Sequence, residues 1–79
     1  MSKKNKNRKL TIATGIEVTD TNIFVTDFEW NRILIYDLNG KLIHIIDEHL
    51  NKPTDIDMIG EKLFVSNYGS GSVAIFYYR

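Results

Sequence analysis

Short apolar runs alternate with short polar segments along almost the whole chain. The runs are rich in β-branched and aromatic residues, and turn-forming residues separate them, which is the pattern of β-strands joined by tight turns. This pattern predicts strands at GIEVT (15–19), NIFVTD (22–27), RILIYD (32–37), KLIHII (41–46), DIDMI (55–59), KLFVSN (62–67) and SVAIFYY (72–78). No window keeps the apolar spacing of an amphipathic helix, and DEHLNK (47–52) is long enough for one helical turn at most. The pattern therefore predicts an all-β fold.

Two kinds of turn residue stand out among the polar segments. Asn39-Gly40 predicts a hairpin with a type I′ turn, which needs positive φ at both central positions. Asp27 and Asn67 each end a predicted strand before a short loop, and such side chains commonly accept hydrogen bonds from nearby turn amides. Gly40, Asp27 and Asn67 are therefore predicted to be structural turn residues. Arg32 is expected to clamp Asp27 or to contact the next unit.

The sequence repeats itself when it is shifted by forty residues. The shift aligns identical residues, namely Phe24-Val25 with Phe64-Val65, Thr14 with Thr54, Ile16 with Ile56 and Ile35 with Ile75. A period near 40 residues is typical of propeller blades and helical solenoids, and the strand pattern favours a propeller.

Consecutive apolar residues in IFV, ILIY and VAIFYY indicate strands that are covered on both faces, as in a blade between two neighbours. The predicted fold is all-β, made of β-propeller blades of about four antiparallel strands. One blade is complete and one is incomplete, within a larger or oligomeric propeller.

Residues 15–43, GIEVTDTNIFVTDFEWNRILIYDLNGKLI, resemble an NHL repeat. The first unit keeps the residues of that pattern, which are Gly15, Ile16, Val18, Asn22 to Val25, Asp27, Asn31-Arg32-Ile33, Tyr36-Asp37 and Gly40-Lys41. Ala13 replaces the usual proline, whereas the second unit keeps Pro53 but has Asp55 where glycine is usual. Its LFVSNYGSGSVAIF (63–76) is similar to the related YVTN-type repeat. The resemblance implies two repeats, approximately residues 13–52 and 53–79, within a domain of residues 9–79.

This resemblance implies a binding platform for protein or RNA, although some relatives are lyases or metal-dependent lactonases. Closed rings of the family commonly have six blades, and this chain holds one full blade and three strands of another. Two explanations stay open: the chain is a piece of a longer propeller, or copies assemble into a homotrimer with two blades each. In the trimer, KLTIA (9–13) is expected to add the missing strand to a neighbour.

Charge is divided unequally along the 79 residues, although the net charge is zero. The first ten residues hold five basic residues and no acid, and residues 1–8 are predicted to be a disordered basic arm. Such an arm could contact RNA through counterion release, and a solubilising role is the simpler interpretation. The absence of cysteine fits a reducing compartment. No apolar run approaches the roughly 18 residues of a membrane span, so a cytoplasmic protein with no membrane contact is expected.

The loops that follow the second strand of each unit hold the candidate binding residues. They are Phe28, Glu29, Trp30, Asn31, Arg32 and Tyr68. An aromatic side chain beside an arginine offers a large apolar area and a planar donor fork, as binding hot spots do. The alternative is that Trp30 packs against the adjacent unit. The function predicted is a non-catalytic protein–protein interaction platform, and the alternatives are a piece of a propeller enzyme or an RNA-binding piece that stacks bases on aromatic side chains.

No catalytic residue, metal ligand or cofactor site is predicted. The sequence holds no nucleophile-elbow, zinc-protease or phosphate-loop motif, and the spacing of His44 and His49 does not match a common zinc site. Glu17 and Asp57 align in the repeat, on the innermost strand of each unit, where the carboxylates of a trimer could surround a hard cation or line a solvated channel. Enzyme activity is left open, and a non-catalytic role is favoured.

Overall fold

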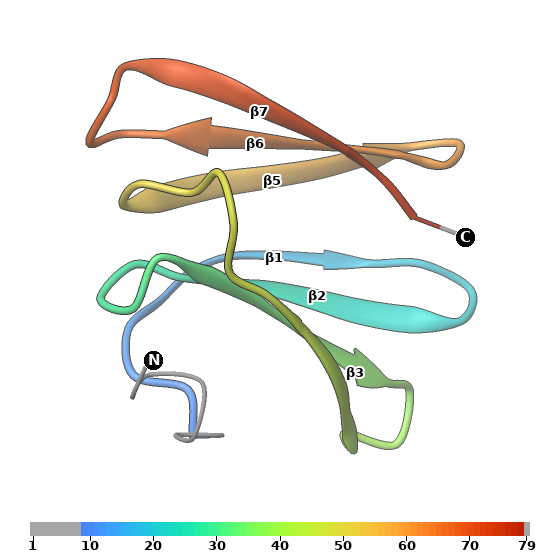
Figure 1. The fold of residues 1–79 in the computed structure, drawn as a ribbon. Coiled ribbons are helices and arrows are strands. Elements are labelled where there is room, and N and C mark those ends of the chain that lie inside the picture. The colour runs from blue at the N-terminus through green and yellow to red at the C-terminus, as the bar shows by residue number, and fades with distance from the viewer. Residues whose placement is uncertain (1–8, 79) are drawn as a thin grey trace.

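The computed structural model describes residues 9–78, which form two antiparallel β-sheets (Figure 1). The strands are β1 (Ala13–Val18), β2 (Asn22–Asp27), β3 (Arg32–Asp37), β4 (Leu42–Ile46), β5 (Pro53–Ile59), β6 (Lys62–Asn67) and β7 (Ser72–Tyr77). Each predicted run forms a strand, and no helix occurs within residues 9–78, so the all-β prediction is confirmed. In the described part, the two sheets do not close into a ring.

Each sheet is a meander in which neighbours in sequence are neighbours in space. The first sheet has the order β1-β2-β3-β4, and the second has the order β5-β6-β7. The strand pairing repeats with the forty-residue shift, because Val25 lies opposite Leu34 and Val65 lies opposite Ala74. The inner hairpins share an irregularity near their first residues as well. The repeat in the sequence is therefore a repeat in the structure.

The same shift relates the loops that enter each sheet. The Phe28 N–H donates to the carbonyl of Ile12 at 2.9 Å, and the Tyr68 N–H donates to the carbonyl of Lys52 at 3.0 Å. Residues 9–12 thus occupy the place in the first unit that residues 49–52 occupy in the second. Within their own chain, residues 9–12 contact the end of β2 and the loop that follows it, and the strand that KLTIA is expected to add to a neighbour stays a prediction.

The two sheets stack face to face, with β5 against β1 and β2 (Figure 1). The core between them consists of Phe24, Ile33, Ile35, Ile56, Leu63 and Val65. The backbones approach closely at Gly15, where an added Cβ would lie 2.5 Å from the carbonyl oxygen of Thr54. Two hydroxyls bridge the sheets here, since Thr14 Oγ1 donates to the Pro53 carbonyl at 2.8 Å and Thr26 Oγ1 to that of Thr54 at 3.3 Å.

The expectation that middle strands are covered on both faces holds for the first sheet only. Val25 and Leu34 lie opposite each other on the face turned away from the second sheet, and both are buried. In β7, by contrast, Val73, Ile75 and Tyr77 are exposed. The prediction was wrong for VAIFYY because no layer within residues 9–78 covers the outer face of the second sheet.

The Asn39-Gly40 hairpin forms, but its turn type differs from the prediction. Gly40 has φ of 89°, whereas Asn39 is not among the residues with positive φ, so the turn is not type I′. Asp37 organises the turn instead, because its Oδ1 accepts hydrogen bonds from the N–H groups of Asn39 and Lys41, both at 2.9 Å. The side chain of Asp37 thus overrides the local preference of the dipeptide.

Three further expectations concern the rest of the chain. DEHLNK is an irregular loop with no helical turn. The basic arm of residues 1–8 lies outside the described residues, as does residue 79. In the described part of the chain, no helix is long and apolar enough to cross a membrane.

Candidate functional site

A buried ion pair holds the loop between β2 and β3. Arg32 Nη2 lies 3.1 Å from Asp27 Oδ2, and both side chains are fully buried. The Asp27 carboxylate also accepts the N–H groups of Thr11 and Ile12, each at 3.2 Å, and Arg32 Nη2 donates to the carbonyl of Lys9 at 2.9 Å. Asp27 therefore connects the segment before β1 to the end of β2 through hydrogen bonds.

Trp30 packs directly over this ion pair. The guanidinium carbon of Arg32 lies 5.3 Å from the centroid of the Trp30 ring, a cation–π distance, and Trp30 is half-buried. Because Arg32 lies beneath the surface, it cannot offer its donor fork to a ligand, and it leaves the set of candidate binding residues. Part of the Trp30 ring therefore packs on its own chain, which agrees with the alternative that Trp30 is a packing residue.

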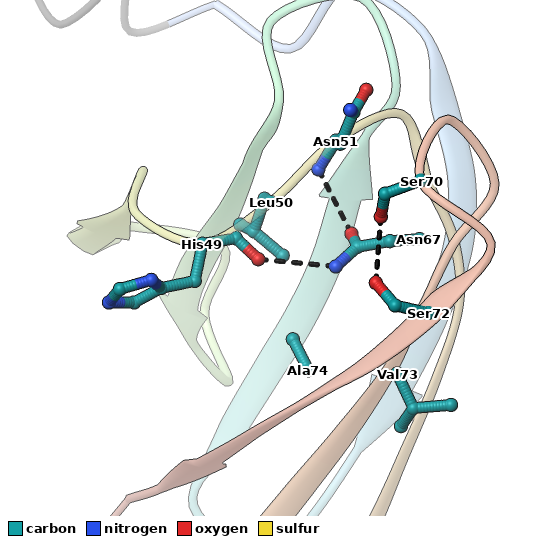
Figure 2. Close-up of a pocket in the computed structure, with 8 residues that line it drawn as sticks. All are labelled: His49, Leu50, Asn51, Asn67, Ser70, Ser72, Val73 and Ala74. Atoms are coloured by element: carbon teal, nitrogen blue, oxygen red, sulfur yellow. Dashed lines mark hydrogen bonds between the residues drawn. The ribbon is translucent and has the colours of Figure 1, made fainter.

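Asn67 occupies the position of Asp27 in the second unit. Its Oδ1 accepts the N–H of Asn51 at 3.0 Å, and its Nδ2 donates to the carbonyl of His49 at 3.1 Å. Ser72 stands where Arg32 stands in the first unit, and it lines an open hollow of about 470 Å³ (Figure 2). Figure 2 shows the lining residues, which are His49, Leu50, Asn51, Asn67, Ser70, Ser72, Val73 and Ala74.

The repeat brings together two aromatic residues from the loops that follow β2 and β6. Phe28 and Tyr68 occupy equivalent positions, and their ring centroids are 6.4 Å apart at an interplanar angle of 38°. Lys52 Nζ lies 5.1 Å from the centroid of Phe28, and the Lys52 N–H donates to Asn31 Oδ1 at 2.7 Å. We call the surface formed by Phe28, Trp30, Asn31, Lys52 and Tyr68 the loop face.

Sequence reasoning missed Lys52. It lies in the connection between the sheets, and only the stacking of the two units carries it over the ring of Phe28. Glu29 is exposed in the turn after β2, beside the loop face. Gly40 lies in the turn between β3 and β4, with the positive φ that favours glycine.

The other candidate polar residues do not form a cluster. His44 is exposed in β4, and His49 Nε2 lies 3.9 Å from Glu48 Oε1 on an exposed surface. Glu17 is half-buried opposite Phe24, whereas its repeat counterpart Asp57 is exposed. Within residues 9–78, no group of three His, Asp or Glu side chains is placed to hold a metal ion.

One titratable group in the first sheet is shifted from its ordinary value. Burial raises the pKa of the Tyr36 phenol above 10.0, because a buried phenolate loses hydration. The positive charge of Arg32 opposes this shift and the negative charge of Asp27 adds to it.

The chain was compared with family models, with curated proteins and with solved structures, and none of them matches it. The assignment of a function therefore depends on the residues and the geometry described above.

Proposed function

We propose that this chain is an NHL-like β-propeller repeat module that acts as a non-catalytic protein–protein interaction platform. Two features support the proposal. The forty-residue repeat recurs in strand pairing and in loop hydrogen bonds. Each unit also contributes one aromatic residue, Phe28 or Tyr68, to the same end of the stacked sheets.

The observation that carries the proposal is the contact between Phe28 and Tyr68 on the loop face. Tyr68 is 73% exposed, so most of its ring faces solvent although the ring lies next to another aromatic residue. Aromatic side chains clustered on a surface are enriched among the anchors of protein interfaces. The half-buried Trp30 adds apolar surface in the same loop as Phe28.

The partner chemistry follows from the charge beside the rings. The ammonium group of Lys52 lies over Phe28 and is part of an exposed residue. A peptide segment with a large apolar or aromatic side chain next to a carboxylate matches this arrangement, because the ring would stack on Phe28 and Tyr68 while the carboxylate pairs with Lys52.

Selection from a displayed peptide library on the immobilised chain tests the proposal. We expect the enriched peptides to combine an aromatic or large aliphatic residue with an adjacent acid. Tyr68→Ala should weaken their binding by about tenfold or more, which corresponds to the loss of at least one aromatic anchor.

Tyr77→Ala is the matched control, since Tyr77 is 68% exposed but lies on β7 away from the loop face. It should leave peptide binding unchanged. Peptides that bind wild type and Tyr68→Ala equally well would refute the loop face as the binding site. Single-stranded RNA is the second ligand to be tested, and RNA binding that falls steeply with salt would favour the nucleic-acid alternative.

A further inference from the structure

The two sheets stack through faces that are not equivalent in the repeat. The first sheet turns Phe24, Thr26, Ile33 and Ile35 toward the second sheet. A forty-residue shift converts these residues into Phe64, Ser66, Val73 and Ile75, which lie on the opposite side of the second sheet. We call that side, together with Asp55 and Asp57, the second outer face.

The converse holds for the residues that the second sheet turns toward the first. Its contribution to the stacking includes Ile56, Met58, Leu63, Val65, Ala74 and Phe76. Their repeat counterparts form the face of the first sheet that is turned away from the second, and they are Ile16, Val18, Ile23, Val25, Leu34 and Tyr36. We call this side the first outer face. Each outer face is thus the repeat counterpart of a surface that is already buried inside the chain.

In the part of the chain that the structure describes, the second outer face exposes apolar side chains, and the first outer face exposes them along β1, whereas Val25 and Leu34 in its middle are buried within the chain. Ile16 and Val73 are each 63% exposed, and Val18 and Ile75 are exposed as well. Their counterparts Ile56 and Ile33 are buried in the core. Contiguous exposed apolar residues of this kind mark interaction surfaces.

The hydroxyl side chains that make polar contacts in the internal stacking also have repeat counterparts in the second sheet. Thr14 and Thr26 donate hydroxyl hydrogen bonds across the internal interface. Thr54 and Ser66 stand at the equivalent positions and keep the hydroxyl group.

We propose that the second outer face of one copy packs on the first outer face of a second copy, so that the internal stacking of the sheets continues between chains. The contact is heterologous, because it joins two different faces, and it generates a closed ring or an open stack according to the rotation between successive sheets. The partner that fits these surfaces best is a second copy of this chain, since its exposed β1 is the repeat counterpart of β5, the strand that makes the internal stacking.

One position differs between the internal interface and the proposed one. Gly15 allows the close approach to the Thr54 carbonyl, and Asp55 stands at its repeat counterpart and is exposed. In the contact between copies, the Asp55 carboxylate would face the carbonyl of Thr14 of the second copy. Asp55 therefore weakens the association, and Asp55→Gly is expected to tighten it by about tenfold.

Two complementary variants test the proposal. Ile16→Lys with Val18→Lys blocks the first outer face, and Val73→Lys with Ile75→Lys blocks the second; all four positions are exposed, so the fold should be kept. Wild type is expected to show a mass in light scattering of at least two chains of 9.2 kDa each. Each variant alone should be monomeric, and the two mixed together should form a 1:1 dimer through their remaining intact faces.

The control is Leu38→Lys, because Leu38 is 51% exposed in a turn and belongs to neither outer face. It should associate like wild type, and circular dichroism checks that every variant keeps its β-structure. A folded wild-type monomer at high micromolar concentration would overturn the proposal. It would also be overturned by a blocked variant that still associates alone, which would show one face binding to itself, or by a mixture that stays monomeric while wild type associates.

Discussion

The repeat uses different chemistry at two pairs of equivalent positions. The first unit has the buried pair of Asp27 and Arg32, and the second unit has Asn67 and Ser72. Both side chains at the turn accept a backbone N–H of the preceding connection. The amide of Asn67 therefore makes the same kind of hydrogen bond without a charge, and Ser72, at the position of the arginine, lines a hollow.

This comparison predicts how the pair responds to substitution. Asp27→Asn alone should lower the free energy of unfolding by about 3–5 kcal/mol, because it leaves the Arg32 guanidinium buried without its carboxylate. The double variant Asp27→Asn with Arg32→Ser should cost less than the sum of the single variants, since it reproduces the chemistry of Asn67 and Ser72. Urea unfolding of the three variants measures both quantities. Strict additivity would contradict the view that the two residues act as a unit.

Tyr36 gives a second prediction at the residue scale. Its pKa is raised above 10.0 in the folded chain by burial, so the unfolded state releases the phenol proton first as the pH rises. The stability that this shift contributes should be fully present below about pH 10 and should be lost above it. Urea unfolding at about pH 9 and about pH 11 measures this loss, and Tyr36→Phe should reduce it. Tyr68→Phe, at an exposed position, is the control; the prediction fails if it reduces the loss as much as Tyr36→Phe does.

At the scale of the elements, the distance between β1 and β5 depends on the absence of a side chain. A Cβ at residue 15 would meet the backbone carbonyl of Thr54, which cannot rotate away as a side chain would. The sheets must therefore shift apart to accept any larger residue. The hydroxyl contacts of Thr14 and Thr26 would lengthen with that shift.

Gly15→Ala should accordingly lower the free energy of unfolding by about 1–3 kcal/mol. Asp55→Ala, at the exposed repeat counterpart, should change it by less than about 0.5 kcal/mol. Denaturant unfolding at low protein concentration compares the two variants without association. Equal effects would show that the close approach at Gly15 contributes nothing to stability.

At the scale of the whole molecule, apolar surface is left on both outer faces. A second copy that covers these faces binds the folded state only, so association and folding should be coupled. The homotrimer expected from the family resemblance stays a prediction, and the mass of the wild-type assembly decides the number of copies.

Thermal unfolding tests this coupling. The midpoint of wild type should rise with protein concentration, at roughly 4–8 °C for each 1 kcal/mol of linked binding in a domain of this size. The midpoint of Val73→Lys with Ile75→Lys should not depend on concentration. A midpoint of wild type that is equally independent of concentration would argue against coupled assembly.

The sequence by itself determined the strands, their order and the repeat. Strand positions follow from runs such as RILIYD between turn residues, because period and turn chemistry are local properties. The forty-residue shift predicted which positions are equivalent, and Phe28 with Tyr68 is one result of it.

Only the tertiary structure decided how these local features combine. The side chain of Asp37 accepts the hydrogen bonds that shape the turn at Gly40. The stacking of the sheets places Lys52 over the ring of Phe28. The ion pair with Asp27 holds Arg32 beneath Trp30. The burial of a residue depends on which layers lie above it, and a run such as VAIFYY is the same whether or not a further sheet is present. The physical reason is that strand pattern is local in the chain, whereas burial and contact are properties of surfaces that meet only after folding.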